Sequence, residues 1–314
     1  MATHPNSCIV GDQSGIVKHE FSPVLPYIHD PHGYTHRDGG RTGKLTAMQK
    51  TTDFLARAIE IARGAGAILL EGYGTLKTIH HKGTIDLVTE FDRRSEAFIV
   101  QALSDHFPEH AIRAEEGGRV SGAGGYEWLV DPLDGTTNFA HNFPCFAVSL
   151  ALTHAGRTIL AVVYEPVHAE LFAATRGGGA TLNGSPIHVS HNSLLEQCML
   201  ATGFPYDLRT NPNNNLAEFH AFLLCAQAVR RPGAAALDLC YTACGRLDGF
   251  WELTLHPWDT AAGGLIVEEA GGRVTTAAGS ESWLSQPSIV ASNGLIHADM
   301  LAVLASTQTS RSLK

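Results

Sequence analysis

Cysteine, positive charge and long apolar runs are all scarce in this sequence. Six cysteines are scattered over the 314 residues, and none forms a Cys-X-X-Cys pair with a matching second pair. This spacing argues against a disulfide framework and is typical of reduced proteins of the cytosol. Cys240 and Cys244 lie one helical turn apart and could share a soft metal. Their apolar neighbours favour the alternative that both are small packed side chains.

The charge balance and the apolar runs exclude further classes of protein. The chain has 22 basic and 31 acidic residues, which gives a formal net charge of -9. This charge argues against general binding to nucleic acid or to anionic membranes. No apolar run reaches the roughly 20 residues of a membrane span, and the N-terminus lacks the order of a signal peptide. We therefore expect a cytoplasmic protein without a nucleic-acid or membrane partner.

Three regions differ in their patterning. Residues 1–47 are rich in Gly, Pro, His and Asp and show no sustained period, so we expect a disordered N-terminal extension. Met48 heads the first patterned segment and is a candidate for an alternative translation start. A single large domain is expected over residues 48–305, because the chain is 44% hydrophobic and can bury a full core. Residues 306–314 are polar and are expected to fray.

Helical and strand-like patterns alternate along the domain. Apolar residues recur every three or four positions over residues 51–70, which predicts an amphipathic helix. A hairpin is predicted at 77–89, and Thr89 with Asp92 predicts a capping box for a helix that ends near Phe107. Further helices are predicted at residues 216–228, 234–245, 259–270 and 294–304, and strands at residues 111–116, 146–153, 158–165, 170–175, 185–189, 198–202, 249–253 and 288–291.

The stretch EWLVDPLDGTTNF at residues 127–139 carries the first chemical signal. An apolar, strand-like run ends in Asp131 and Asp134, and Pro132 is expected to turn the backbone out of the strand. The residues from Gly135 onward can then open a helix. Carboxylates attract a hard divalent cation, whereas amides at a helix start attract an anion such as phosphate. The alternative is an Asp-Pro turn that binds nothing.

Other carboxylates stand at similar junctions. Glu115 and Glu116 end the strand predicted at residues 111–116, and binding groups tend to cluster at such strand ends in α/β sheets. Asp259 lies where a loop passes into a helix. Each of these acids also has an interpretation without a ligand. Glu115 and Glu116 could simply be solvated, and Asp259 could only interact favourably with the helix dipole. Asp92 could likewise be a capping residue and nothing more.

Taken together, four segments resemble one family. In order, they are residues 82–92, AEE at 114–116, DPLDGT at 131–136 and WDTAAG at 258–263. They resemble the inositol monophosphatase family of Mg2+-dependent, Li+-sensitive phosphatases. The resemblance covers roughly residues 51–304 and implies an α/β fold of the α+β type, a layered αβαβα sandwich of the inositol monophosphatase/fructose-bisphosphatase kind. It also implies a homodimer.

The resemblance implies a set of metal ligands. Glu115, Asp131 and the main-chain carbonyl of Leu133 would bind one Mg2+, and Asp131, Asp134 and Asp259 a second. A third, weaker Mg2+ would share Glu115. Carboxylate and carbonyl oxygens are the ligands that Mg2+ prefers, and a cation would relieve the repulsion among four carboxylates.

Catalytic roles also follow from the resemblance. Thr136, hydrogen-bonded to Asp92, would orient and help to deprotonate a water that attacks phosphorus in line with the leaving group. Glu116 would support this arrangement without contacting the metal ions itself. The backbone amides of Gly135 and Thr136 would hold the phosphate.

The alcohol part of the substrate is less well specified. Glu252 matches a glutamate that contacts inositol hydroxyls in the family, Asp134 and Asp259 could contribute, and Gly233 with Ala234 matches a loop near the ring. Many relatives carry a hydroxyl residue in place of Ala234, which leaves the choice of polyol open. The turn at residues 82–86, in the hairpin that supports the third metal, is one residue shorter than in some relatives.

The expected activity is hydrolysis of inositol monophosphate to inositol and phosphate. One alternative is the same chemistry on another small phosphate ester: histidinol phosphate, a sugar bisphosphate or a phosphoadenosine nucleotide. A second alternative is a regulatory protein that keeps the fold without turnover.

Overall fold

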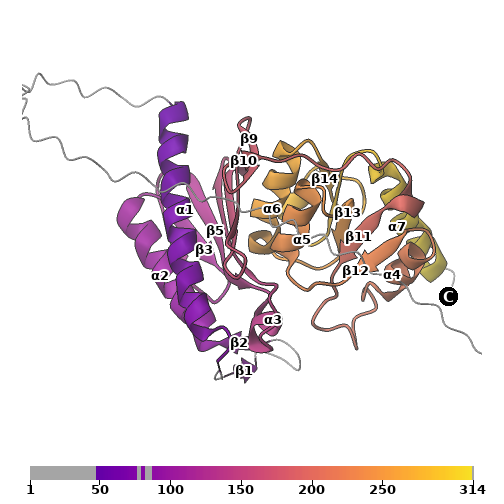
Figure 1. The fold of residues 1–314 in the computed structure, drawn as a ribbon, viewed down its shortest axis with the longest axis horizontal. Coiled ribbons are helices and arrows are strands. Elements are labelled where there is room, and N and C mark those ends of the chain that lie inside the picture. Colours follow the sequence, from indigo (N-terminus) through magenta and orange to yellow (C-terminus); the bar gives the residue numbers. More distant parts are fainter. Residues whose placement is uncertain (1–46, 76–78, 82–86, 313–314) are drawn as a thin grey trace, which may run out of the picture. The chain divides into compact units, whose positions relative to one another are not determined.

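A mixed sheet of eight strands is the framework of the fold (Figure 1). The computed structural model describes residues 47–75, 79–81 and 87–312, which belong to one unit, Leu45–Lys314. The predicted N-terminal extension and the turn at residues 82–86 lie outside the described residues. In spatial order the strands are β10 (Ser185–Pro186), β9 (Gly179–Leu182), β8 (Glu170–Thr175), β7 (Arg157–Glu165), β6 (Ala147–His154), β5 (Tyr126–Asp134), β3 (Ala111–Ala114) and β4 (Arg119–Val120). Only β3 and β5 pair in parallel within it.

A second sheet of five strands follows in the C-terminal half. Its order is β12 (Ala228–Arg230), β11 (Met199–Thr202), β13 (Gly249–Glu252), β15 (Ile289–Ser292) and β14 (Arg273–Thr275). β11 runs parallel to both of its neighbours, and the other pairs are antiparallel. A small antiparallel hairpin of β1 (Ile79–His81) and β2 (Leu87–Thr89) confirms the hairpin predicted at residues 77–89.

Helices and sheets alternate in five layers (Figure 1). The helices α1 (Ala47–Gly72) and α2 (Glu90–His106) pack on the outer face of the large sheet. The helices α5 (Ala235–Ala243) and α6 (Pro257–Glu269) lie between the two sheets, and α4 (Leu216–Leu223) and α7 (His297–Ser312) cover the far face of the small sheet. Shorter helical turns are α3 (Thr136–Ala140), η1 (Leu195–Gln197) and η2 (Trp283–Ser285). The predicted αβαβα sandwich is therefore confirmed.

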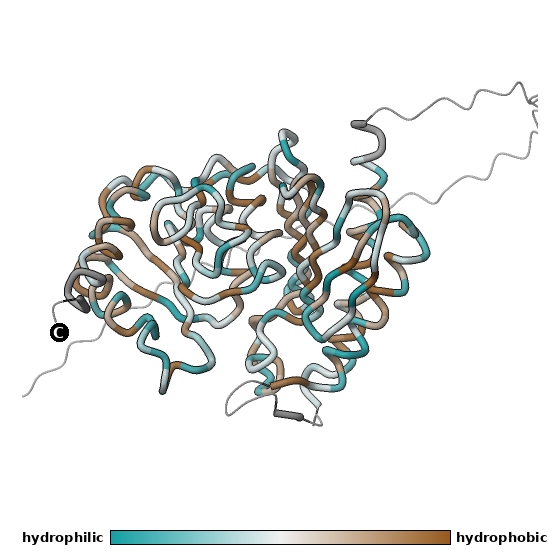
Figure 2. Tube along the Cα trace, turned by 180° about the vertical axis from the view of Figure 1, so that it is seen from behind, coloured by the Kyte–Doolittle hydropathy of each residue, from teal (hydrophilic) through white to brown (hydrophobic). Residues whose placement is uncertain are grey.

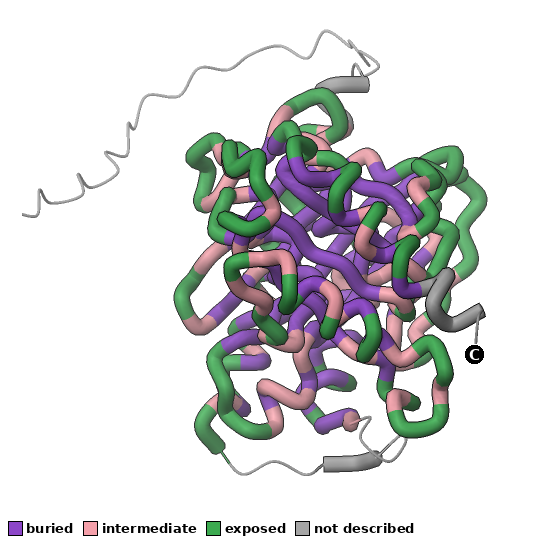
Figure 3. The backbone as a smooth tube through the Cα atoms, turned by 90° about the vertical axis from the view of Figure 1, so that its right-hand side faces the viewer, coloured by how far each residue is buried: buried purple, intermediate pink, exposed green. Residues whose placement is uncertain are grey.

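Strand periodicity explains how the large sheet serves two cores. Successive side chains of a strand point to opposite faces. In β6, Val148 and Leu150 are buried under α1 and α2, whereas Ala147 and Ala151 are buried against α5 and α6. Figure 2 shows hydrophobic residues along these strands, and Figure 3 shows buried strands inside a shell of exposed loops. None of the helices in the described part of the chain has the length and apolar character needed to cross a bilayer.

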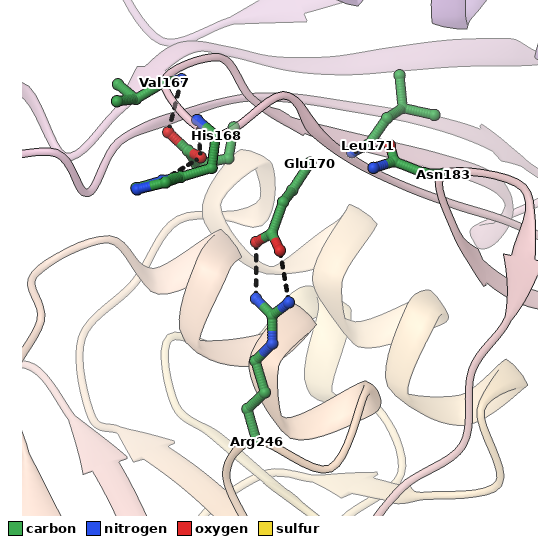
Figure 4. A network of polar contacts seen from close by, with 7 residues as sticks. Val167, His168, Glu170, Leu171, Asn183 and Arg246 are labelled. Carbon is green, nitrogen blue, oxygen red and sulfur yellow. Dashed lines mark hydrogen bonds and ion pairs between the residues drawn. The ribbon is translucent and has the colours of Figure 1, made fainter. Parts of the chain in front are cut away.

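The central helix layer is held close to its neighbours by small residues and by an ion pair. A Cβ atom on Gly263 of α6 would lie 2.5 Å from the Leu239 Cβ atom of α5, so glycine is what lets the two helices approach. Arg246, just after α5, donates to both carboxylate oxygens of Glu170 at the start of β8, over 2.7 and 2.5 Å (Figure 4). This bidentate pair fastens α5 to the large sheet.

β5 departs from the expectation at its end. The sequence predicts a turn out of the strand at Pro132, whereas β5 continues to Asp134. Pro132 has no N–H to donate to the neighbouring strand, and the pairing with β6 shifts register between Asp131 and Asp134 before it resumes. A bulge therefore accommodates the proline without ending the strand.

Other boundaries also differ from the predictions. The helix predicted at residues 216–228 ends at Leu223, and its last residue, Ala228, instead begins the edge strand β12, which pairs in parallel with β11. The strand predicted at residues 185–189 is reduced to β10. The last helix, predicted to end at residue 304, runs on to Ser312, so residues 306–312 are helical where fraying was expected.

Candidate active site

A cavity of about 290 Å³ lies where both sheets meet the starts of α3, α5 and α6. Strand ends and helix starts from distant parts of the chain line it, as the resemblance implied. The cavity brings together these predicted residues: Glu115, Asp131, Leu133, Asp134, Gly135, Thr136, Gly233, Ala234, Glu252 and Asp259. Asp92 and Glu116 are not part of its wall.

The end of β5 is shaped by its own short-range bonds. Asp131 Oδ1 accepts a hydrogen bond from the Leu133 amide at 2.9 Å. Gly135 then adopts φ = 89°, a left-handed conformation that favours glycine. A Cβ atom at this position would also lie 2.8 Å from the Cys145 carbonyl oxygen, so no other residue fits. This turn brings Thr136 back toward the carbonyl of Leu133, with 3.1 Å between Thr136 Oγ1 and the carbonyl oxygen.

The acidic side chains of the cavity destabilise one another's charged forms. Burial raises the pKa of Asp131 well above its usual value, and the charges of Glu115, Asp134 and Asp259 raise it further. Burial likewise raises the pKa of Asp259, although the His256 amide, 2.7 Å from Oδ2, stabilises its charged form. Four acids in one desolvated space are tolerable when a cation neutralises them.

The donor set fits a hard divalent cation. All of its side-chain donors are carboxylates, and Mg2+ prefers oxygen ligands. Within the described residues, no three His, Cys, Asp or Glu side chains are grouped tightly enough to enclose an ion by themselves. Such a cage is not required, because Mg2+ keeps several waters and is commonly held by one or two carboxylates. The carboxylates of this cavity are close enough to repel one another. The cavity still has room for water and substrate.

Asp134 has a second role that the sequence did not indicate. Its two carboxylate oxygens accept hydrogen bonds from the amides of Ala235 and Ala236, at 3.1 and 2.8 Å. Burial raises its pKa to about 6 against the opposing effect of these amides. Asp134 thereby ties the end of β5 to the first turn of α5.

The structure joins Asp92 to Thr136, as the resemblance implied. Thr136 Oγ1 lies 3.0 Å from Asp92 Oδ1. The other oxygen, Oδ2, accepts from the amide and the hydroxyl of Thr89 at 2.8 and 2.6 Å and completes the predicted capping box of α2. Burial raises the pKa of Asp92 to about 6, against the lowering effect of these bonds. Asp92 is therefore both a capping residue and the partner of Thr136.

The loop after β3 depends on a residue that the sequence reading missed. Glu96 of α2 is buried, and its carboxylate accepts from the amides of Glu116 and Gly118 at 2.7 and 2.9 Å. These bonds fix the loop that presents Glu115 to the cavity. Glu116 does not line the cavity, but its charge helps to raise the pKa of Asp92.

The end of the cavity around Glu252 contains several residues that were not predicted. Burial raises the pKa of Glu252 to about 8, although the positive charge of Arg231 opposes this shift. A side chain at Gly203 would overlap the Glu252 carboxylate, so glycine makes room for it. Asp238 also lines this end, and its Oδ1 atom has no hydrogen-bond partner in the described residues. We did not assign Gly203, Arg231 or Asp238 to the site from the sequence, although signals were available: Gly203 follows a predicted strand end, Arg231 belongs to a basic pair that could serve a nucleotide substrate, and Asp238 is a charge among apolar neighbours.

Comparisons with known proteins show which family the chain resembles. The family model for the inositol monophosphatase family matches residues 50–310. The chain is 45% identical to the inositol-1-monophosphatase of Synechocystis over 81% of its length and 89% of that protein. It is 44% identical to the putative Nus factor SuhB of Neisseria meningitidis serogroup B, over 80% of this chain and 97% of that protein. The structure of SuhB from Bartonella henselae matches with a TM-score of 0.77 and 39% identity, over 80% of this chain and 98% of that one. The chain belongs to the inositol monophosphatase family.

Proposed function

We propose that the chain is a Mg2+-dependent phosphomonoesterase that hydrolyses inositol monophosphate to inositol and phosphate. The observation that carries this proposal is the meeting of Glu115, Asp131, Asp134 and Asp259 in one cavity beside the Thr136–Asp92 pair. Cations would neutralise this cluster of acids, whose pKa values are raised. The bound cations would in turn attract a negatively charged phosphate substrate. The names of relatives such as the Synechocystis inositol-1-monophosphatase support the same choice.

Two or three Mg2+ ions would be held by Glu115, Asp131, Asp134, Asp259 and the Leu133 carbonyl. When bound, they would acidify a water and neutralise charge that develops on the phosphoryl oxygens.

The residues around this set would orient the water and the phosphate. Thr136 Oγ1 can accept a hydrogen bond from the attacking water while it donates its own proton to Asp92 Oδ1. Asp92, held by Thr89, is a carboxylate near neutral pH and can take up the proton that the water loses. The charge of Glu116 raises the pKa of Asp92 and so favours its uptake of a proton. The first amides of α3, at Gly135 and Thr136, have no intrahelical acceptor and can donate to the phosphate.

A polyol would meet a polar surface at the other end of the cavity. Glu252 is buried there, and Arg231 and Asp238 share the wall. The backbone of Gly233 and Ala234 supplies further polar groups, and Asp134 and Asp259 are close enough to Glu252 for their charges to interact. Hydroxyl groups could pair with these acids, which is why a polyol phosphate is the preferred substrate. Histidinol phosphate, a sugar bisphosphate and a phosphoadenosine nucleotide are the alternatives.

Phosphate release from a panel of these esters, with and without Mg2+, tests the proposal. We expect release that requires Mg2+ and is fastest with inositol 1-phosphate. Release only from nucleotides would refute the inositol assignment, and no release from any ester would refute the enzyme assignment.

The second candidate is a role without hydrolysis. It is favoured by the names of several relatives, which are called Nus factor SuhB. The same panel separates the two candidates, because a protein without turnover would release no phosphate even with Mg2+. We also propose that the chain forms a homodimer, which light scattering on the eluting peak of a size-exclusion column would test.

A further inference from the structure

A second cavity of about 1010 Å³ lies between the large sheet, α6 and the segment that carries β14 and η2. It shares no lining residue with the carboxylate cavity. β5 contributes Glu127 and Leu129, from its first half, to this second cavity, whereas Asp131 and Asp134, near its end, face the first. No step of the proposed reaction uses this space.

Four arginines line the second cavity: Arg113, Arg157, Arg176 and Arg273. Glu127, Glu268 and Glu281 also line it, so guanidinium groups outnumber carboxylates there, although the chain as a whole is acidic. A local excess of positive charge on an acidic protein favours an anionic ligand.

Two of the arginines are held in place by protein groups. Arg176 donates from Nε to the Thr158 carbonyl oxygen at 2.7 Å and from Nη2 to Glu268 Oε2 at 2.9 Å. Arg113 lies beside Glu127, with 3.7 Å between Nε and Oε1. In contrast, Arg157 and Arg273 are exposed, and within the described ranges neither forms an ion pair. Their guanidinium groups are therefore available to a ligand.

An apolar surface completes the wall. Leu129, Val274 and Trp283 are buried residues that line the cavity. The indole of Trp283 is oriented by a hydrogen bond from Nε1 to Glu268 Oε1 at 3.2 Å. Glu268 also accepts the hydrogen bond from Arg176. Ligand sites commonly combine an apolar wall with a few oriented polar groups.

We propose that this second cavity binds an organic phosphate, a molecule with a phosphate group and an apolar or aromatic body. The phosphate is held by Arg157 and Arg273, whose planar guanidinium groups suit its oxygens. The body lies against Leu129, Val274 and Trp283. This site is independent of the proposed hydrolytic activity.

Calorimetric titration of the full chain with ADP, in the presence of EDTA, tests the proposal. Without divalent cations the carboxylate cavity repels anions, so binding reports on the second cavity alone. The test variant is Arg157→Ala with Arg273→Ala. The control is Arg63→Ala with Arg93→Ala, which removes the same charge from exposed positions on α1 and α2. Melting curves show whether each variant is folded.

We expect one ADP per chain, with affinity at least about tenfold weaker in the test variant and unchanged in the control. Equal affinity in both variants, or no saturable binding to the wild type, would overturn the proposal. ADP that binds no more tightly than pyrophosphate would overturn the role of the apolar wall. Should the alanine variant fail to fold, Arg157→Lys with Arg273→Lys keeps the charge but loses the bidentate geometry, and we again expect weaker binding.

Discussion

Asp92 and Thr136 are expected to act as one unit, and a double-mutant cycle on this pair tests the proposed proton path. Asp92→Asn keeps one acceptor oxygen, which can continue to cap α2 through Thr89. The amide NH2 then faces Thr136 Oγ1 and cannot take up a proton. Thr136→Val removes the hydroxyl that would orient the water.

The expected loss of kcat follows from the proposed role of Asp92 as a general base. A positioned general base contributes about 10²–10⁴ in rate, so we expect kcat to fall by about 10²–10³ in Asp92→Asn, or about 3–4 kcal/mol of barrier. Because Thr136 acts through Asp92, the double variant is expected to be no slower than the slower single variant. Stability changes little, by about 1 kcal/mol or less, since the cap keeps an oxygen acceptor.

The pH profile gives the pair a signature that a structural role would lack. Burial holds the pKa of Asp92 at about 6, and a protonated Asp92 cannot accept a proton. Activity is therefore expected to fall as the pH drops through this value, or through a lower one where bound cations favour the ionised form. Asp92→Asn is expected to lose this acidic limb. Multiplicative losses in the double variant, or a full acidic limb in Asp92→Asn, would show that Asp92 and Thr136 do not form one proton path.

Four further predictions concern the cavity. Asp131→Asn is expected to keep no more than a few per cent of the activity at saturating Mg2+, because a ligand shared by two cations is among the costliest to lose; steady-state rates measure this. Burial and neighbouring acids raise the pKa of Asp131, so its contribution to stability is present at low pH and is lost as the pH rises. In EDTA above about pH 7, Asp131→Asn is thus expected to melt at a higher temperature than the wild type, and added Mg2+ to narrow the gap; a lower melting temperature would contradict the repulsion. Gly203→Ala is expected to displace Glu252 and raise KM for inositol 1-phosphate more than for a phosphate ester without hydroxyls, and an equal rise for both would argue against a polyol contact. Millimolar LiCl is expected to inhibit turnover, and turnover that LiCl does not inhibit would count against the second cation site.

Local patterns predicted the parts of the site that lie close together in the sequence. Thr89 and Asp92 form the expected capping box, because both partners belong to one helical turn. The acids at the end of β5 and at the start of α6 also follow from motifs of a few residues. Asp259 lies in the first turn of α6, although the helix begins slightly earlier than predicted, at Pro257.

Contacts between distant segments could not be predicted in this way. Glu96 supports the Glu115 loop through two backbone amides, and nothing in the helix pattern of α2 distinguishes it from a solvated glutamate. Gly203 matters only because β13 brings Glu252 beside it. The strand β12 was missed because three residues at a sheet edge carry no period of their own.

The four-acid cavity is the proposed cation-dependent phosphatase centre. The most direct test is phosphate release from inositol 1-phosphate by the full chain, with EDTA and then with excess Mg2+, beside Asp131→Asn. We expect release by the wild type that begins only with Mg2+, and almost no release by Asp131→Asn. Release that persists in EDTA, or equal release by both proteins, would contradict this expectation.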